Sequence, residues 1–373
     1  MSRESLSKDP PKDQARKDIW NLALKYRKGT STTQQQADEG VETTIMVVGN
    51  KQAGKSSLIH RLQNKGDIPP PTTALEYRFA RSTRGTIKDI SHIWELAGGT
   101  HLTDLIDIPV NESNIHLTTF VIVIDLSEPA DALPLLEHFL DKIQARAKKV
   151  LDGLESRGSK RPKGLRAFAS KKYGPDHPDI KSDAMYICPV PIVIVGAKYD
   201  LYRDIEPEKR KLFCKTLRFL AHTQGASLAF ANLNDETSSV KVKRILNHHA
   251  FRSNPLLEMS HDYNKPIVIT AGQDAFSQIG VPPSEAAKDA VGKQAFAGYD
   301  KWRNDFDRYF PQKRATLSNL EAIDFSKYGE PRVDAMRAQK ELSVSFFLIP
   351  QKLMITQVRN WNVCVEWWTR KFP

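Results

Sequence analysis

The sequence predicts an α/β domain in which a mainly parallel sheet carries helices on both faces. Three observations predict this fold. Apolar, strand-like runs alternate with segments of helical periodicity, a phosphate-loop pattern at residues 49–56 follows the first run, and later candidate motifs also follow strands. Because ligands bind at the carboxyl ends of the strands in such sheets, we expect these motifs to form one site.

The loop at residues 49–56 reads Gly-Asn-Lys-Gln-Ala-Gly-Lys-Ser and leads into a helix-compatible segment ending near residue 65. Four residues between the glycines let the backbone wrap a phosphate with its N–H groups at a helix N-terminus. Lys55 then reaches the β/γ-phosphates, and the Ser56 hydroxyl ligates Mg²⁺. A phosphate loop retained only as a scaffold is the alternative. The predicted nucleotide-binding residues in this stretch are Gly49, Asn50, Lys51, Gln52, Ala53, Gly54, Lys55, Ser56 and Ser57.

Length and composition describe an ordinary soluble chain of one large or two smaller domains. Its 373 residues are 27% charged and 40% apolar, and none of its apolar runs approaches the roughly 18 residues of a membrane span. The polar N-terminus lacks the apolar core of a signal peptide. Three widely spaced cysteines without a C-x-x-C pair indicate a reducing compartment. We therefore expect a cytoplasmic protein without membrane insertion.

The net charge of +11 comes mostly from one segment, residues 142–172, which has a surplus of nine positive charges. Its glycines and Pro162 favour a solvated insertion at about residues 155–187. An acidic protein partner is the next alternative. Nucleic acid is the least favoured, because few aromatic residues are present to stack on bases.

The N-terminal region, residues 1–40, is expected to contain a helix at residues 13–28 followed by a linker. The apolar stripe of this helix packs on the domain in the favoured interpretation, and contacts a partner in the alternative. The stripe consists of Ile19, Trp20, Leu22, Ala23 and Tyr26.

The predicted phosphate-loop domain spans residues 41–252. Its first strand is expected at residues 43–48, directly before the phosphate loop. Further strands are expected in the second part of residues 72–79, at 87–96, within 116–126, at 190–196 and at 227–231. Helices are expected at residues 131–154, 206–224 and 238–251.

A C-terminal extension, residues 253–342, is expected to contain an aromatic helix from about residue 293 to residue 309. So much aromatic surface has to be covered, either by folding back on the domain, which is favoured, or by a larger partner. The aromatic stripe consists of Phe296, Tyr299, Trp302, Phe306 and Tyr309.

The remaining motifs favour guanine-nucleotide binding over hydrolysis. Thr72 is placed to sense Mg²⁺ and the γ-phosphate beside Ser56, and Gly98 closes Glu-Leu-Ala-Gly at the position of Asp-x-x-Gly. Gly99 replaces the water-orienting glutamine. After the strand at 190–196, Lys198 and Asp200 retain the base-reading residues of Asn-Lys-x-Asp, whereas Ala197 replaces its asparagine. GDP or GTP with Mg²⁺ is the expected ligand, and no catalytic residue is predicted.

Several runs together resemble the dynein light intermediate chains: residues 71–77, 94–100, 191–200, 208–222 and 225–228. The stretch 264–280 is similar to the cytoplasmic dynein-2 branch of that family. The resemblance covers about residues 18–342. The chain departs from it at residues 343–373, an atypical tail to which we assign no function.

The resemblance implies a Ras-like domain with flanking N- and C-terminal helices. It further implies a non-catalytic subunit of the dynein-2 motor that binds the heavy-chain tail and supports retrograde intraflagellar transport and cilium assembly. Motor ATPase activity would then belong to the heavy chain. Expected partners are the dynein-2 heavy chain, other dynein-2 subunits and intraflagellar transport particles, at the cytoskeleton and cilium, including basal body and axoneme.

In that family the flanking helices dock on the heavy chain, which assigns partner contacts here to Trp20, Phe296, Tyr299, Trp302 and Phe306. The alternative function is a small-GTPase-like switch. Gly99 and Ala197 favour the structural subunit, while Thr72 and the phosphate loop keep the switch open.

Overall fold

A computed structural model describes residues 40–84, 87–181, 185–233, 235–286, 298–312, 331, 335–336 and 338–340. It divides into two compact units, Met1–Gln312 and Lys313–Pro373, and the described part of the first contains every element discussed below. The predicted helix at residues 13–28 with Trp20, the stripe residue Phe296 and the tail at 343–373 lie outside the described residues.

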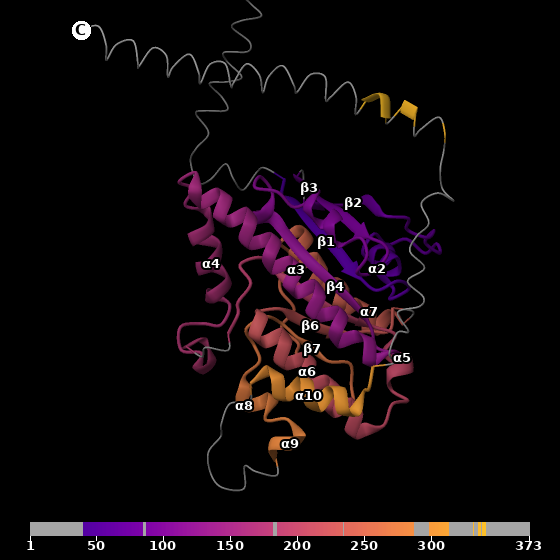
Figure 1. The fold of residues 1–373 in the computed structure, drawn as a ribbon, viewed down its shortest axis with the longest axis vertical. Helices are drawn as coiled ribbons and strands as arrows, with labels where there is room; N and C mark the ends of the chain where they lie inside the picture. The colour runs from indigo at the N-terminus through magenta and orange to yellow at the C-terminus, as the bar shows by residue number, and fades with distance from the viewer. Residues whose placement is uncertain are drawn as a thin grey trace, which may run out of the picture. The chain divides into compact units, whose positions relative to one another are not determined.

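Seven strands form one sheet in the order β2-β3-β1-β4-β5-β6-β7 (Figure 1). The five strands from β3 to β6 are parallel to one another, and β2 and β7 pair antiparallel at the two edges. This confirms the predicted α/β class with a mainly parallel sheet. The strands are β1 (Glu42–Gly49), β2 (Leu75–Arg84), β3 (Ile87–Leu96), β4 (Thr118–Asp125), β5 (Ile192–Ala197), β6 (Ser227–Phe230) and β7 (Val268–Ile269).

Side chains of the central strands point alternately to the two faces of the sheet, which divides the core into two layers. Met46 of β1 belongs to the cluster formed with α3 (Pro129–Ser156) and α6 (Pro207–Gln224), whereas Ile45 belongs to the cluster formed with α2 (Lys55–Leu62) and α7 (Glu236–Phe251). Successive side chains of a strand point to opposite faces, so both faces are covered by helices, as predicted. None of the described helices is long and apolar enough to cross a bilayer.

The predicted basic insertion contains a helix that the sequence did not indicate, α4 (Arg161–Lys171). It packs against α3 and buries Pro162 and Ala169. Only these two of its residues are buried, so its apolar periodicity is too weak to predict a helix. The shorter elements are η2 (Thr103–Asp107), η3 (Ile115–Leu117), η4 (Pro178–Lys181), α5 (Tyr199–Tyr202), α8 (Phe276–Ile279) and α9 (Pro283–Ala286).

The described residues between 253 and 312 continue the domain. Strand β7 extends the sheet next to β6, and the segment after it is tied to α6 by a buried ion pair. Arg218 donates from Nε and Nη2 to the two carboxylate oxygens of Asp274, at 2.8 and 2.6 Å. This two-point geometry fixes the segment that leads to α8 and α9.

Helix α10 (Tyr299–Tyr309) closes the domain by packing on α6. Trp302 and Phe306 are fully buried, with ring centroids 5.8 Å from Phe219 and 5.9 Å from Phe213, respectively. The half-buried Tyr299 donates its hydroxyl to Glu137 of α3. Because Trp302 and Phe306 fill the domain's own core, the prediction that they contact a partner is wrong, and the part of the stripe that the structure describes folds back on the domain.

Truncating either buried ring should destabilise the domain. Trp302→Ala and Phe306→Ala should each cost about 3–5 kcal/mol of unfolding free energy, because each removes a large side chain and leaves a cavity. Chemical denaturation followed by circular dichroism measures this cost. Tyr309→Ala, on the partly exposed side of the same helix, is the control and should cost less than about 1 kcal/mol. Equal losses in all three variants would contradict this account of α10.

Candidate functional site

The strand register brings the predicted motifs to one edge of the sheet. Glu95 of β3 lies opposite Val47 of β1, and Asp125 at the end of β4 lies opposite Ala197 at the end of β5. The phosphate loop follows the end of β1 directly. The loops after β1, β3, β4 and β5 therefore converge at the carboxyl edge, where ligands bind in folds of this class.

The phosphate loop needs glycine at both ends. A Cβ on Gly49 would lie 2.1 Å from the carbonyl oxygen of Val123, and Gly54 has a left-handed φ of 94°. A Cβ on Gly54 would also meet Leu233 at 3.1 Å. Helix α2 starts directly after Gly54 and has no acidic residue in its first turn, so its N-terminus suits an anion.

Lys55 is buried and held over the loop. Its Nζ donates to the carbonyl oxygens of Gly49 at 3.1 Å and Asn50 at 2.7 Å. Burial lowers the pKa of Lys55, and the negative charge of Glu95 opposes that shift. An ammonium group has three N–H donors. Two are used by the loop, so one is left for a phosphate oxygen.

Ser56, Thr72 and Glu95 meet beside Lys55. The Ser56 hydroxyl donates to Oε1 of Glu95 at 2.6 Å and lies 3.3 Å from the Thr72 hydroxyl. Adjacent ligands of an octahedral Mg²⁺ lie about 3 Å apart, given metal–oxygen distances of roughly 2.1 Å. Oε2 of Glu95 is buried without a hydrogen-bond partner among the described residues. This set of oxygens fits Mg²⁺, with Ser56 and Thr72 as ligands and Glu95 as acceptor for a metal-bound water.

The loop after β3 offers backbone groups but few side chains to the site. Gly98 and Gly99 both have left-handed φ angles, 76° and 60°. A Cβ on Gly99 would lie 3.1 Å from Oδ1 of Asn50. The position therefore disfavours a side chain, and the chain offers no glutamine there to orient water.

The two predicted base-reading residues, Lys198 and Asp200, differ in their surroundings. Lys198, in a left-handed conformation, pairs through Nζ with the carboxylate of Asp125, which also accepts from the Ser127 hydroxyl. Asp200 is exposed and has no ion pair within the part of the chain that the structure describes. The pairing of Lys198 with Asp125 was not visible from sequence, because the two residues are far apart in the chain.

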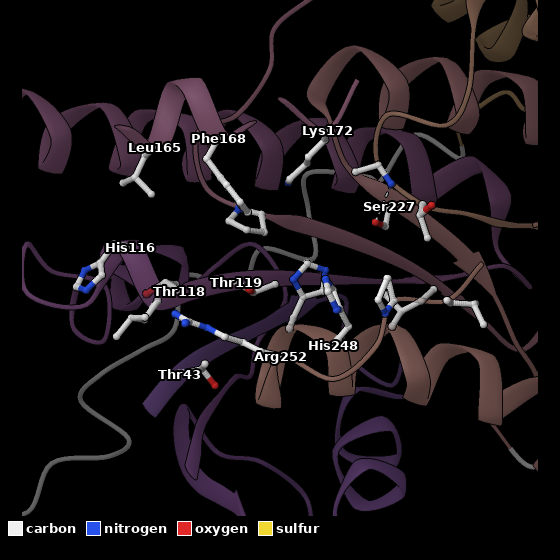
Figure 2. Close-up of a pocket in the computed structure, with 18 residues that line it drawn as sticks. Thr43, His116, Thr118, Thr119, Leu165, Phe168, Lys172, Ser227, His248 and Arg252 are labelled. Atoms are coloured by element: carbon white, nitrogen blue, oxygen red, sulfur yellow. Dashed lines mark hydrogen bonds between the residues drawn. The ribbon is translucent and has the colours of Figure 1, made fainter. Parts of the chain in front are cut away.

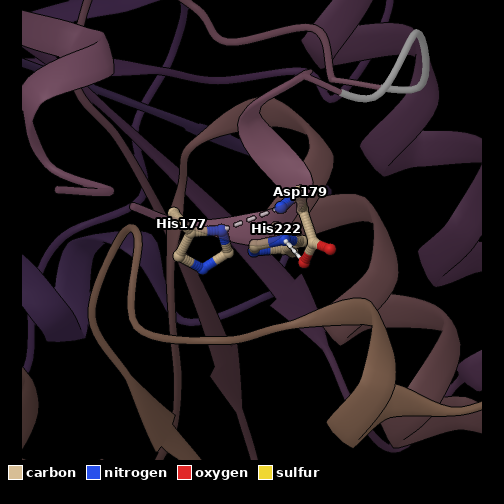
Figure 3. Close-up of side chains that lie close together, drawn as sticks. All are labelled: His177, Asp179 and His222. Carbon is tan, nitrogen blue, oxygen red and sulfur yellow. Dashed lines mark hydrogen bonds and ion pairs between the residues drawn. The ribbon is translucent and has the colours of Figure 1, made fainter. Parts of the chain in front are cut away.

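A second polar cluster, His177, Asp179 and His222, was also missed (Figure 3). Its possible metal-ligating atoms lie within 4.8 Å of one another, and it is the one such group of His, Cys, Asp and Glu side chains among the described residues. Hydrogen bonds already engage each residue: Asp179 accepts from Nε2 of His222 at 3.0 Å and from the N–H of Phe276 at 2.8 Å. His177 contacts the carbonyl of Asp274 through Nε2 at 3.0 Å. We assign the cluster a structural role, joining η4, α6 and α8.

Comparison with known proteins gives a consistent family. A family model described as dynein light intermediate chain matches residues 15–170. Cytoplasmic dynein 2 light intermediate chain 1 of Bos taurus is 37% identical over 330 residues, covering 87% of this chain and 93% of its own. The Homo sapiens protein of the same name is 37% identical over 334 residues with the same coverage. The Danio rerio protein is 34% identical over 334 residues, covering 87% and 92%.

Among solved structures, a crystal structure of the conserved domain of a dynein light intermediate chain matches with a TM-score of 0.50. It covers 74% of this chain and 93% of its own at 13% identity. At this identity the match shows the fold alone.

The buried His222 makes stability depend on pH. Burial lowers the pKa of His222 below its ordinary value of 6.5, while the hydrogen bond to Asp179 opposes the shift. As pH drops below about 6.5, the unfolded chain therefore protonates His222 more readily than the folded chain does. The free energy of unfolding falls over this range. Thermal melts from about pH 7.5 to about pH 5.5 should show a shallower decline for His222→Gln than for wild type. Parallel declines would contradict this assignment.

Proposed function

The chain belongs to the dynein light intermediate chain family, and on this premise we propose that it is a non-catalytic subunit of a cytoplasmic dynein 2 motor. The observation that carries the proposal is 37% identity to cytoplasmic dynein 2 light intermediate chains along 87% of the chain. The Ras-like order of the sheet supports it, since the solved structure of a light intermediate chain domain has the same fold.

We further propose that the chain binds the heavy-chain tail and acts with other dynein-2 subunits and intraflagellar transport particles. Its role would be retrograde intraflagellar transport and cilium assembly, at the cilium and the cytoskeleton. The contact is assigned to the N-terminal segment that carries Trp20, together with Phe296. Helix α10 does not supply this contact through Trp302 and Phe306, because both rings are buried in its own domain.

At the nucleotide site we propose a guanine nucleotide with Mg²⁺ as a structural ligand. The backbone N–H groups of residues 49–57 and the free donor of Lys55 would hold its phosphates, and Ser56 and Thr72 the metal. Gly98 would offer its N–H to a γ-phosphate, and Lys198 and Asp200 would read the base. Bound Mg²⁺ would neutralise phosphate charge.

A working GTPase switch is the second candidate. The meeting of Ser56, Thr72 and Glu95 favours it, because switch proteins sense the γ-phosphate through such a metal site. The glycine at position 99 counts against it, since hydrolysis needs an oriented water. Measured turnover separates the two candidates.

The heavy-chain contact is testable at Trp20. If this ring is an anchor of the interface, Trp20→Ala should weaken binding to the heavy-chain tail at least about tenfold. Surface plasmon resonance with immobilised tail gives the affinity. The matched control is Ile68→Ala, which removes a side chain that is 93% exposed and should leave the affinity unchanged. Equal affinity of Trp20→Ala and wild type would reject Trp20 as an anchor.

The nucleotide site is testable at Lys55. Lys55→Ala should remove co-purified nucleotide, because the buried ammonium facing the phosphates is lost. The exposed Lys65→Ala, outside the proposed phosphate contacts, should retain it. Mass spectrometry of the denatured protein identifies what was bound.

Turnover of loaded protein tests the role of that nucleotide. Single-turnover assays on GTP-loaded wild type should show very slow hydrolysis, because position 99 has no side chain. Fast hydrolysis that disappears in Lys55→Ala would establish the switch instead.

A further inference from the structure

A large cavity lies at the amino edge of the sheet, opposite the phosphate loop (Figure 2). Its floor includes Thr43 near the start of β1, Thr118 at the start of β4 and Ser227 at the start of β6. Helices α4 and α7 form its sides. The volume of about 860 Å³ is within the range of ligand-binding sites.

The sides of the cavity are largely apolar. Leu165 and Phe168 of α4 line it together with Ile245 of α7 and Leu256. Phe168 is 60% exposed, although the helix that carries it is packed on α3. A large exposed ring beside a cavity is typical of a surface that receives an apolar side chain.

The charge of the cavity is entirely positive. No Asp or Glu is present among the described residues that line it, whereas Lys172 and Arg252 are. His249 also lines the cavity, and burial lowers its pKa to about 3, so its ring carries no charge. Positive charge also extends to Arg161, which together with Arg252 lowers the pKa of His116, after the larger effect of burial.

The positive surface continues along α4 beyond the cavity. Arg166 is neutralised by Glu155, whereas the exposed Arg161 has no ion pair within the described residues. Arg161 lies four residues before Leu165, on the helix face that Phe168 and Lys172 share. A small anion would need only one or two of these charges. The three charges of Arg161, Lys172 and Arg252 together fit a chain with several carboxylates.

We propose that the cavity between α4 and α7 binds an acidic amphipathic segment of a partner protein. Its apolar side chains would lie against Phe168 and Ile245, and its carboxylates would face Arg252, Lys172 and Arg161. This site lies at the opposite edge of the sheet from the phosphate loop.

The chain's own N-terminal segment is a poor occupant, although it joins the domain close to Thr43. Residues 13–28 carry five basic and two acidic side chains, so their charge repels the cavity. Nucleic acid is disfavoured because Phe168 is the single Phe, Tyr or Trp among the described lining residues, leaving little to stack on bases.

The test uses the full chain and a labelled synthetic 16-residue peptide, with leucine at helical spacing and glutamate elsewhere. Fluorescence anisotropy should show saturable binding that Phe168→Ala and Arg252→Asn each weaken at least about fivefold. Both positions are exposed, and asparagine tolerates the left-handed backbone at 252, so both variants should fold. Lys149→Gln, an exposed charge on α3 outside the cavity, is the matched control and should bind like wild type.

Four results would overturn the proposal. They are no binding, equal binding by the cavity variants and wild type, equal binding of a peptide with lysine in place of glutamate, and binding only after residues 1–39 are removed. Displacement of the peptide by single-stranded RNA or by anionic lipid vesicles at lower concentration than by unlabelled peptide would assign the cavity to those ligands instead.

Discussion

Parallel pairing of β1 with both β3 and β4 is the constraint on which the other features depend. It sets the loops after these strands side by side, so that Ser56 meets Glu95 although the two are 39 residues apart. The same register places the starts of β1 and β4 at the opposite edge, where Thr43 and Thr118 line the cavity. The phosphate-loop edge and the cavity are thus at two ends of one sheet, separated by its buried core.

The parts of the fold that could be predicted from sequence have local signals. The run at residues 120–124 is apolar on both faces, as expected for a strand covered by helices on both sides, and it is the buried centre of β4. The phosphate loop was recognisable because its pattern of glycines, lysine and serine lies within eight consecutive residues. The contact that requires glycine at position 49, with the backbone of β4, is seen only in the fold.

The parts that could not be predicted depend on contacts between distant segments. The aromatic stripe has the same helical period whether α6 or another protein covers it, so only the packing of Trp302 on Phe219 decides between them. The polar cluster around His222 could not be predicted, because its partner Asp179 lies 43 residues earlier in the chain. The basic segment that composition describes as solvated is partly a helix, because burial of Pro162 and Ala169 holds it against α3.

We infer that this chain is a structural motor subunit whose proposed nucleotide site does not act as a switch. The most direct test measures the affinity of the heavy-chain tail for the chain loaded with GDP and for the chain loaded with a non-hydrolysable GTP analogue. If the nucleotide is a structural ligand, the dissociation constants of the heavy-chain tail for the two loaded forms should be equal within about twofold. A ligand shifts an equilibrium only by its differential affinity for two states. A difference of about tenfold or more, or roughly 1.4 kcal/mol, would contradict the account and show a switch.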